Sequence, residues 1–155
     1  MSKPTPEADA AARPGFDPER FFKLASQVGH GRAIGMHYHG HGDDWDEISL
    51  PWREQLVGIR ETGILASGAI VSLIDTCAGM SVWVARGHFR PMATLDLRID
   101  YLKPAPKGAT VYARCQCYKI TRAVAFVRGT AHLGDINDPI AQAALTFMTT
   151  SSISP

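Results

Sequence analysis

Small residues come directly before a long apolar run in the middle of the chain, where Ala66, Ser67 and Gly68 stand in a row. If the run that follows is a helix, its first amide groups have no partners within the helix and lie at the positive end of the helix dipole. Small side chains let a ligand approach such a backbone closely. The segment therefore predicts a binding site for a developing oxyanion.

Asp75 is the second residue in this region that suggests chemistry, since it stands alone among apolar neighbours, with Ser72 and Gly79 about one helical turn away on either side. A carboxylate in such surroundings is costly unless it is hydrogen-bonded, partly solvated or used in a reaction. By itself the residue fits a capped or solvated aspartate as well as a catalytic one.

A polar row follows in the next expected strand, where Thr94, Asp96, Arg98 and Asp100 alternate with apolar residues. Alternate residues of a strand share one face. This row is unusually polar for a core-forming sheet, although a polar face is ordinarily the solvent side. The sequence thus predicts that all four side chains point the same way.

The element that must position these groups is a helix over 67–86, because apolar residues cover nearly its whole circumference. Gly87 is expected to end it. A shorter helix is predicted from Asp17, which can cap it, to about residue 27, and Gly29 and Gly31 should break it.

Alternating and β-branched patterns predict strands in the rest of the chain. A strand from Ala33 to about residue 39 and its hairpin partner over 45–50 come first, with a helical turn over 52–56. Four long strands follow the central helix and suggest an antiparallel meander, at 92–102, 110–118, 123–133 and 139–149. The order predicts an α+β fold in which one antiparallel sheet wraps around one long central helix.

Composition favours one globular domain over 17–155, with residues 1–16 as a flexible tail, in a chain of 155 residues that is 45% hydrophobic. The net charge of +1 argues against a nucleic-acid partner. Neither a membrane span nor a secretory signal is expected, because the apolar runs are shorter than these segments require. The three cysteines predict free thiols and a cytoplasmic location.

The segment GILASGAIVSLIDTCAG at 63–79, followed by ATLDLRIDYLKPA at 93–105, resembles the hotdog-fold acyl-CoA thioesterases of the phenylacetate-degradation (PaaI-like) group. The likeness extends over about residues 30–150 and includes the closing strand IAQAALTFM at 140–148. It implies a hotdog fold, an acyl-CoA substrate, no cofactor or metal, and assembly as dimers or dimers of dimers.

The resemblance also implies roles for individual residues. The family's oxyanion amide falls on Ser67, its catalytic carboxylate on Asp75, and a hydroxyl that holds the water on Thr94. Its usual histidine is replaced by Ala66, and a polar residue upstream of the helix falls near Arg60.

These roles describe thioester hydrolysis, in which the Ser67 amide, helped by Gly68, polarises the carbonyl. Asp75 then acts either as a base on water or as a nucleophile that forms a mixed anhydride. Substrate-binding roles are expected for Ala66, Arg60, Gly79, Arg98, Arg122 and Trp83. Candidates to meet the phosphates of coenzyme A are Arg98, Lys103, Lys107, Lys119 and Arg122, although each is more often plain surface charge. Candidates to line the acyl pocket are Met80, Trp83, Val84 and Phe89, for which core packing is the more ordinary role.

Spacing on the helix adds a constraint of its own. Ser67 and Asp75 are eight residues apart, which is roughly 12 Å along a helix axis. One thioester must lie about 3 Å from both groups. A two-fold dimer with antiparallel helices meets this requirement, because each Asp75 then faces the other chain's Ser67 amide.

Two other interpretations stay open at this point. His37, His39 and His41 alternate and could converge on a metal, although a solvent-facing edge near the hairpin is the favoured interpretation. Replacement of the family's histidine by Ala66 also leaves a non-catalytic acyl-CoA-binding or sensing protein on the same fold. Release of free thiol from acyl-CoA would separate the enzyme from the binding protein.

Overall fold

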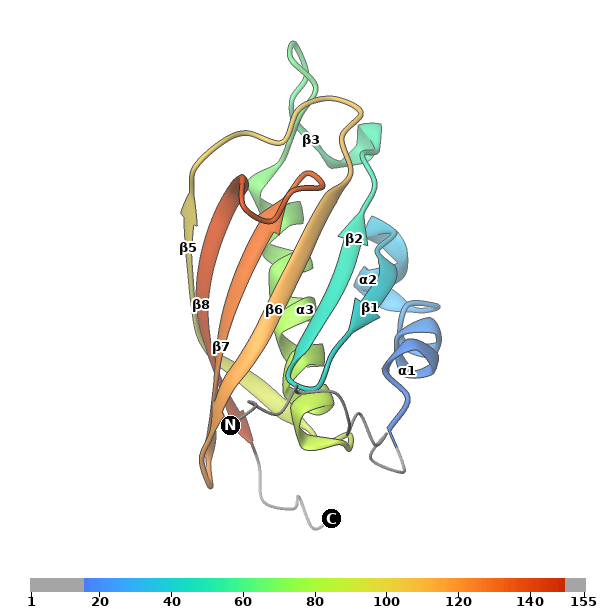
Figure 1. Cartoon of the computed structure of the whole chain (residues 1–155). Helices are drawn as coiled ribbons and strands as arrows, with labels where there is room; N and C mark the ends of the chain where they lie inside the picture. Colours follow the sequence, from blue (N-terminus) through green and yellow to red (C-terminus); the bar gives the residue numbers. More distant parts are fainter. Residues whose placement is uncertain (1–15, 150–155) are drawn as a thin grey trace, which may run out of the picture.

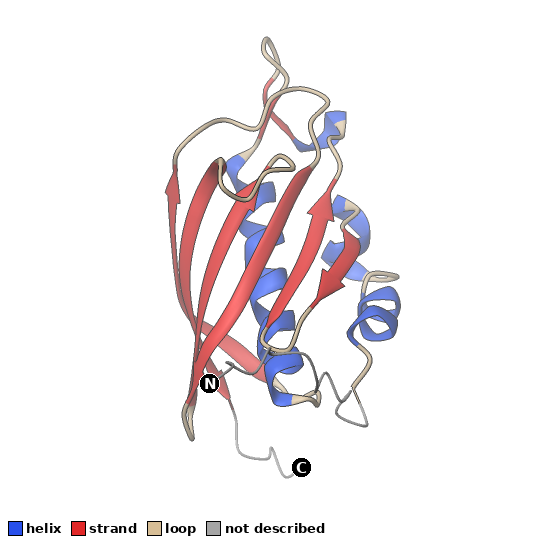
Figure 2. Cartoon of the chain, in the orientation of Figure 1, coloured by secondary structure: helices blue, strands red, loops and turns tan. Residues whose placement is uncertain are grey.

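A computed structural model describes residues 16–149 of the chain. It shows one six-stranded antiparallel sheet curved around a long helix, with two short helices beside one edge of the sheet (Figures 1 and 2). The expected flexible tail at 1–16 lies, except for Phe16, outside the described residues.

The central helix, α3, spans Ser67–Arg86, as predicted. Leu73, Ile74 and Cys77 on it are fully buried under β2, β6 and β7. Gly87 ends the helix with a left-handed φ of 72°, and its amide donates to the carbonyls of Trp83 and Val84. By length and composition alone α3 is also apolar enough to cross a membrane, contrary to the expectation from sequence, but 61% of that window is buried inside the protein.

The six strands of the sheet run in the order β1-β2-β6-β7-β8-β5, and every neighbouring pair is antiparallel. Their bounds are β1 His37–His41, β2 Trp45–Leu50, β5 Met92–Tyr101, β6 Val111–Ile120, β7 Val124–His132 and β8 Pro139–Thr149. Strands β6, β7 and β8 form the predicted meander. The prediction is wrong for β5, which pairs with β8 at the edge, so that the connection from 102 to 110 crosses over one end of the sheet (Figure 1).

Two short helices precede the sheet. Helix α1 spans Pro18–Ala25, and the Asp17 carboxylate caps it by accepting from the Arg20 amide at 3.0 Å. Helix α2, Gly29–Ile34, occupies residues expected to be a break and the start of a strand. The two positive-φ glycines explain the error: Gly29 (φ 61°) reverses the chain after α1, and Gly35 (φ 73°) ends α2, so the strand starts only at His37.

A small second sheet supports the N-terminal end of α3. The 3₁₀ turn η1, Glu54–Leu56, confirms the expected helical turn, and β3 (Val57–Ile59) then pairs with β4 (Ile64–Leu65), a pairing the sequence did not predict. The Ala66 amide donates to the Leu56 carbonyl at 2.8 Å. These bonds fix where the long helix begins.

Strand β5 contains a β-bulge at Leu95, because Thr94 pairs with Phe147 while Asp96 pairs with Thr146. The extra residue reverses the side-chain alternation along the strand. Thr94 therefore faces α3, whereas Asp96, Arg98 and Asp100 lie on the opposite face from the core-packed Leu97 and Ile99. The prediction that all four polar residues share one face is wrong.

A buried acid lies on the inner side of the sheet. Asp46 on β2 has no exposed surface, and burial, with a smaller contribution from neighbouring Glu47, raises its pKa to about 8 against the lowering influence of the Tyr38 hydroxyl. The buried Cys77 thiol lies within hydrogen-bond distance of the main-chain carbonyls of Asp46 and Ala113, which share its one proton. All three cysteines are free and buried, which confirms the prediction of free thiols.

Asp46 makes stability depend on pH. The pKa of this side chain is 3.8 in the unfolded chain and about 8 in the folded protein. Between these pH values the folded state therefore binds more protons than the unfolded state, and stability falls as pH rises. We expect the free energy of unfolding of wild type, relative to Asp46→Asn, to fall by about 1.4 kcal/mol per pH unit between pH 5 and 7. Urea unfolding across this pH range measures the free energy, and Asp43→Asn in the exposed β1–β2 turn is the control. If wild type and Asp46→Asn showed the same dependence of the free energy of unfolding on pH, the raised pKa of Asp46 would be contradicted.

Candidate active site

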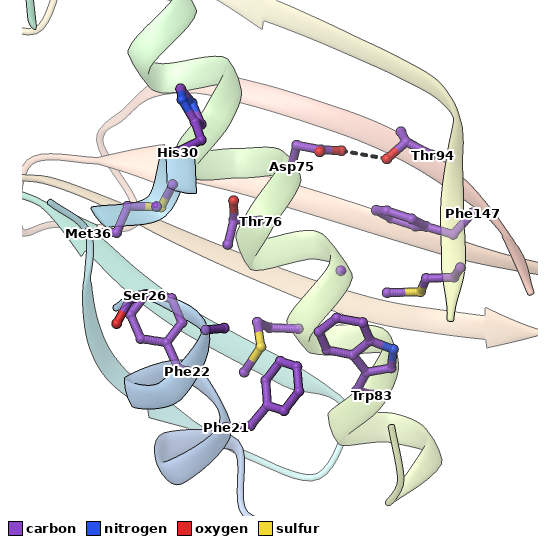
Figure 3. Close-up of a pocket in the computed structure, with 15 residues that line it drawn as sticks. Phe21, Phe22, Ser26, His30, Met36, Asp75, Thr76, Trp83, Thr94 and Phe147 are labelled. Atoms are coloured by element: carbon purple, nitrogen blue, oxygen red, sulfur yellow. Dashed lines mark hydrogen bonds between the residues drawn. The ribbon is translucent and has the colours of Figure 1, made fainter. Parts of the chain in front are cut away.

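The carboxylate of Asp75 is bound to the edge strand. The Thr94 hydroxyl donates to Asp75 Oδ1 at 2.8 Å, which ties the middle of α3 to β5 (Figure 3). Asp75 is half-buried, with one carboxylate oxygen held by this bond. The structure thus brings together two of the residues that the sequence singled out, and it does so through the bulge at Leu95.

A pocket of about 380 Å³ opens beside this pair. Its walls come from α1, α2, α3, β5 and β8, and most of its surface is apolar. The lining residues are Phe21, Phe22, Ala25, Ser26, His30, Gly31, Met36, Asp75, Thr76, Gly79, Met80, Trp83, Met92, Thr94 and Phe147. A carboxylate and a hydroxyl beside an apolar cavity suit a reaction centre attached to a hydrocarbon group.

Aromatic rings close one end of the pocket. The Phe21 ring lies edge-on to Trp83 with centroids 4.9 Å apart, and Phe89 stacks on Phe21 at 5.2 Å. Of the four residues considered for the acyl pocket, Met80 and Trp83 line this cavity, whereas Val84 and Phe89 do not. Sequence reasoning missed the wall made by α1, although its adjacent phenylalanines were a signal that one face of that helix is covered.

His30 was also missed. Its Nε2 lies 2.8 Å from the Ser72 hydroxyl, whose own proton goes to the Gly68 carbonyl at 3.1 Å. A hydroxyl has one proton, so the imidazole is the donor in the first bond. The family's histidine is absent at Ala66, yet α2 brings an imidazole to the helix one turn before Asp75. Only the folded chain reveals it, because His30 and Ser72 are 42 residues apart.

The N-terminal turn of α3 is open. Ala66 is the N-cap and makes no side-chain cap bond, and Ser67 and Gly68 are exposed. A Cβ added to Gly68 would meet no atom within 4 Å, so a ligand has room to approach this backbone. The Tyr101 hydroxyl donates to the Ser67 carbonyl at 3.2 Å and ties this end of the helix to the far end of β5.

Asp75 and Ser67 therefore contact β5 seven residues apart, at Thr94 and at Tyr101. Within one chain the carboxylate and the helix amides face different ends of the edge strand. This separation agrees with the spacing argument from the sequence.

The other expected binding residues are scattered. Gly79 is buried in the pocket wall, where a Cβ would come within 3.3 Å of the Met92 methyl. Arg98 lies on the outer face of β5 and bonds to Asp100 at 3.1 Å. Arg122 lies in the β6–β7 turn, at the end of the sheet opposite to β3 (Figure 1). Arg60 follows β3 and lines a separate pocket.

The histidines of β1 do not converge. The His39 ring packs on Tyr112 and lies 3.4 Å from Glu47, while a bulge between Tyr38 and Gly40 places the His41 ring beside Tyr38. All three histidines of this strand are exposed on the sheet edge. Within residues 16–149 the structure holds no group of three histidine, cysteine or acidic side chains arranged for a metal.

Comparison with known proteins supplies the family. A model of the thioesterase superfamily matches residues 62–140. The medium/long-chain acyl-CoA thioesterase YigI of Escherichia coli is 28% identical over 130 residues, which cover 76% of this chain and 83% of that protein. A solved structure from Pseudomonas aeruginosa is 34% identical, covers 86% of this chain and 97% of its own, and superposes with a TM-score of 0.75.

More distant structures agree on the fold. Thioesterase HI1161 from Haemophilus influenzae is 19% identical, with a TM-score of 0.77 over 90% of this chain and 94% of its own. A point mutant of the phenylacetic acid degradation protein PaaI from Thermus thermophilus is 21% identical, with a TM-score of 0.67 over 77% of this chain and 96% of its own. The sheet wrapped around α3 is thus the hotdog fold, and with the family match across the segment that carries Ser67, Asp75 and Thr94, the chain belongs to the thioesterase superfamily and is a thioester hydrolase.

Proposed function

We propose that the protein hydrolyses acyl-CoA to a free acid and coenzyme A at two equivalent sites, each built from two copies of the chain. The observation that carries the proposal is the placement of the two half-sites: Asp75 is tied to Thr94 at one end of β5, and Ser67 to Tyr101 at the other.

Strand β5 is suited to pair with a second copy of itself. In the described part of the chain it pairs only with β8, so its other edge presents unpaired main-chain groups. Large apolar side chains along and just after it are exposed, with Leu95 at 54%, Tyr101 at 46% and Leu102 at 55%. An exposed apolar edge strand favours pairing with another chain.

Antiparallel pairing about a two-fold axis at Arg98, with Leu95 as the extra residue of the bulge, places Thr94 opposite Tyr101 of the partner subunit. Asp75 then approaches the N-terminal turn of the partner's α3, because each of these strand residues is hydrogen-bonded to its own half-site. Such a dimer satisfies the requirement that one thioester meet both groups.

In this site the Ser67 and Gly68 amides of one chain stabilise the charge that develops on the thioester oxygen. Asp75 of the other chain, oriented by Thr94, either takes a proton from water or attacks the carbonyl carbon. Both routes break the carbon–sulfur bond and release the thiol of coenzyme A. On the second route water then hydrolyses the mixed anhydride and restores the carboxylate.

The apolar pocket holds the acyl group. It begins at Asp75 and Thr94 and ends at the aromatic rings of Phe21 and Trp83. A cavity of about 380 Å³ lined mainly by hydrocarbon suits an acyl chain of medium or greater length. The name of the Escherichia coli relative, a medium/long-chain acyl-CoA thioesterase, agrees with this substrate class.

Asp75→Asn tests the carboxylate. The amide keeps the shape of the side chain but neither takes a proton from water nor attacks as a carboxylate, so we expect kcat to fall at least about 100-fold with little change in KM. Thiol release from decanoyl-CoA measures the rate, and Asp43→Asn is the matched control. Wild-type turnover by Asp75→Asn would contradict this mechanism, and a wild type that releases no thiol from acyl-CoA of any length would favour the binding protein.

Ser67→Pro tests the shared site. Ser67 is the first residue of α3, where proline fits a helix, and Ala66 is already extended (ψ 137°), as the residue before proline must be. The substitution therefore removes the amide hydrogen while sparing the helix, and we expect it to abolish hydrolysis. Mixing Ser67→Pro with Asp75→Asn chains should restore one intact site per heterodimer, or about a quarter of wild-type activity for an equal, freely exchanged mixture. No recovery despite confirmed exchange would contradict a site built from two chains.

Phe21→Ala tests the pocket wall. Removing this ring opens the closed end of the pocket, so we expect the chain length with the highest kcat/KM to increase. A series of straight-chain acyl-CoA substrates measures the profile. Leu24→Ala is the control, because Leu24 is on the same helix but 67% exposed. An unchanged profile in Phe21→Ala would show that α1 does not limit the acyl chain.

A further inference from the structure

A second pocket lies beside the N-terminal end of α3 and is polar where the acyl pocket is apolar. Its volume is about 550 Å³, and it is lined by Trp52, Glu54, Gln55, Val57, Arg60, Gly63 and Lys107. These residues come from the segment before β3, the first residue of β3, the β3–β4 turn and the connection between β5 and β6. The mechanism described above leaves this pocket without a role.

The pocket is fixed to the helix start by short bonds. The Trp52 indole donates to the Gly63 carbonyl at 2.8 Å, and the Leu65 amide donates to the Ala105 carbonyl at 3.1 Å. Gly63 has a φ of 71°, and a Cβ there would meet the Lys107 stem at 2.8 Å, so the lysine packs directly on the glycine. Hydrogen bonds thus join the pocket walls to the segment that leads directly into α3.

Charge distinguishes this pocket from other basic positions. Among the cations that the sequence offered for phosphate, Arg98 pairs with Asp100 and Lys103 with Asp138. Lys119 and Arg122 lie in or beside the β6–β7 turn, at the far end of the sheet from β3 (Figure 1).

Arg60 and Lys107 differ from these cations both in ion pairing and in position. Within residues 16–149 neither forms an ion pair, and the Lys107 ammonium instead lies 5.9 Å from the centre of the Trp52 ring. Glu54 also lines the pocket and contributes the one negative charge. Two unpaired cations against one anion leave a site that favours a phosphate group.

We propose that this pocket binds the phosphates at the nucleotide end of coenzyme A, with Arg60 and Lys107 as the phosphate-binding residues. The inference rests on the proposed function: a thioester held at the Ser67 amide has its pantetheine arm leading away from the acyl pocket. The arm then runs past Gly63 towards the two cations. Arg60 accordingly acts on the remote end of the substrate and not on the reacting carbonyl.

Two substrates that differ only in the nucleotide test the proposal. Decanoyl-CoA carries the phosphates, whereas the decanoyl thioester of pantetheine lacks them. We expect Arg60→Ala and Lys107→Gln each to raise KM for decanoyl-CoA about tenfold, the effect of losing one charge-assisted contact, and to leave kcat unchanged. Neither variant should change kcat/KM for the pantetheine thioester. Arg128→Gln, on β7 and stacked on Tyr118, is the charge-matched control and should behave as wild type with both substrates.

The other outcomes overturn the proposal in distinguishable ways. If Arg60→Ala lowered kcat/KM equally for both substrates, Arg60 would act at the thioester. If neither variant lowered kcat/KM for either substrate, the phosphates would bind elsewhere. Adenosine 3′,5′-bisphosphate should inhibit decanoyl-CoA hydrolysis competitively, and both variants should weaken this inhibition; inhibition unaffected by either would exclude this pocket. Turnover of the pantetheine thioester by wild type shows separately that the hydrolase function stands.

Discussion

Helix α3 is apolar over nearly its whole circumference, and the rest of the structure is arranged to cover it. The sheet buries the face that carries Leu73, Ile74 and Cys77. The sheet is open, with β1 and β5 at its edges, so one side of the helix needs other cover, which α1 and the aromatic rings around Trp83 provide in part. The half-buried Asp75 lies on this side, where a carboxylate keeps contact with solvent and with the strand edge. The site therefore occupies the part of the helix that the sheet leaves open.

The sequence was informative where physical patterns are local. A continuous apolar circumference with glycine at the end defined α3 to the residue, and alternation located β6, β7 and β8 within two residues at either end. Pairing between distant strands leaves no such trace, which is why β5 was placed beside β6 when it lies beside β8. Helix α2 was missed because two of its six residues are glycine, and its short turn forms between two glycines that reverse the chain.

The candidate site was predictable in part for the same reason. Asp75, Ser67 and Thr94 follow from the family resemblance together with the helix period, and the hydrogen bond between Asp75 and Thr94 places two of them together. Phe21 and His30 reach the pocket from elements far along the chain, so no spacing rule could include them. Arg98 was misplaced by a single inserted residue, since regular alternation from Thr94 to Asp100 conceals a bulge that only strand pairing reveals.

The bulge divides β5 into two parts whose side-chain alternation differs by one residue. Before Leu95, the side chains of Met92 and Thr94 line the cavity; after it, the alternation shifts by one and the charged residues turn outward. The strand can therefore present a hydroxyl to the helix and still keep Asp96 in water, a combination that an unbroken period of two would forbid. Without Leu95, Thr94 and Asp96 would be adjacent, and regular alternation would already turn the first to the helix and the second to solvent. The bulge thus takes up the one residue by which this segment is too long for that pattern.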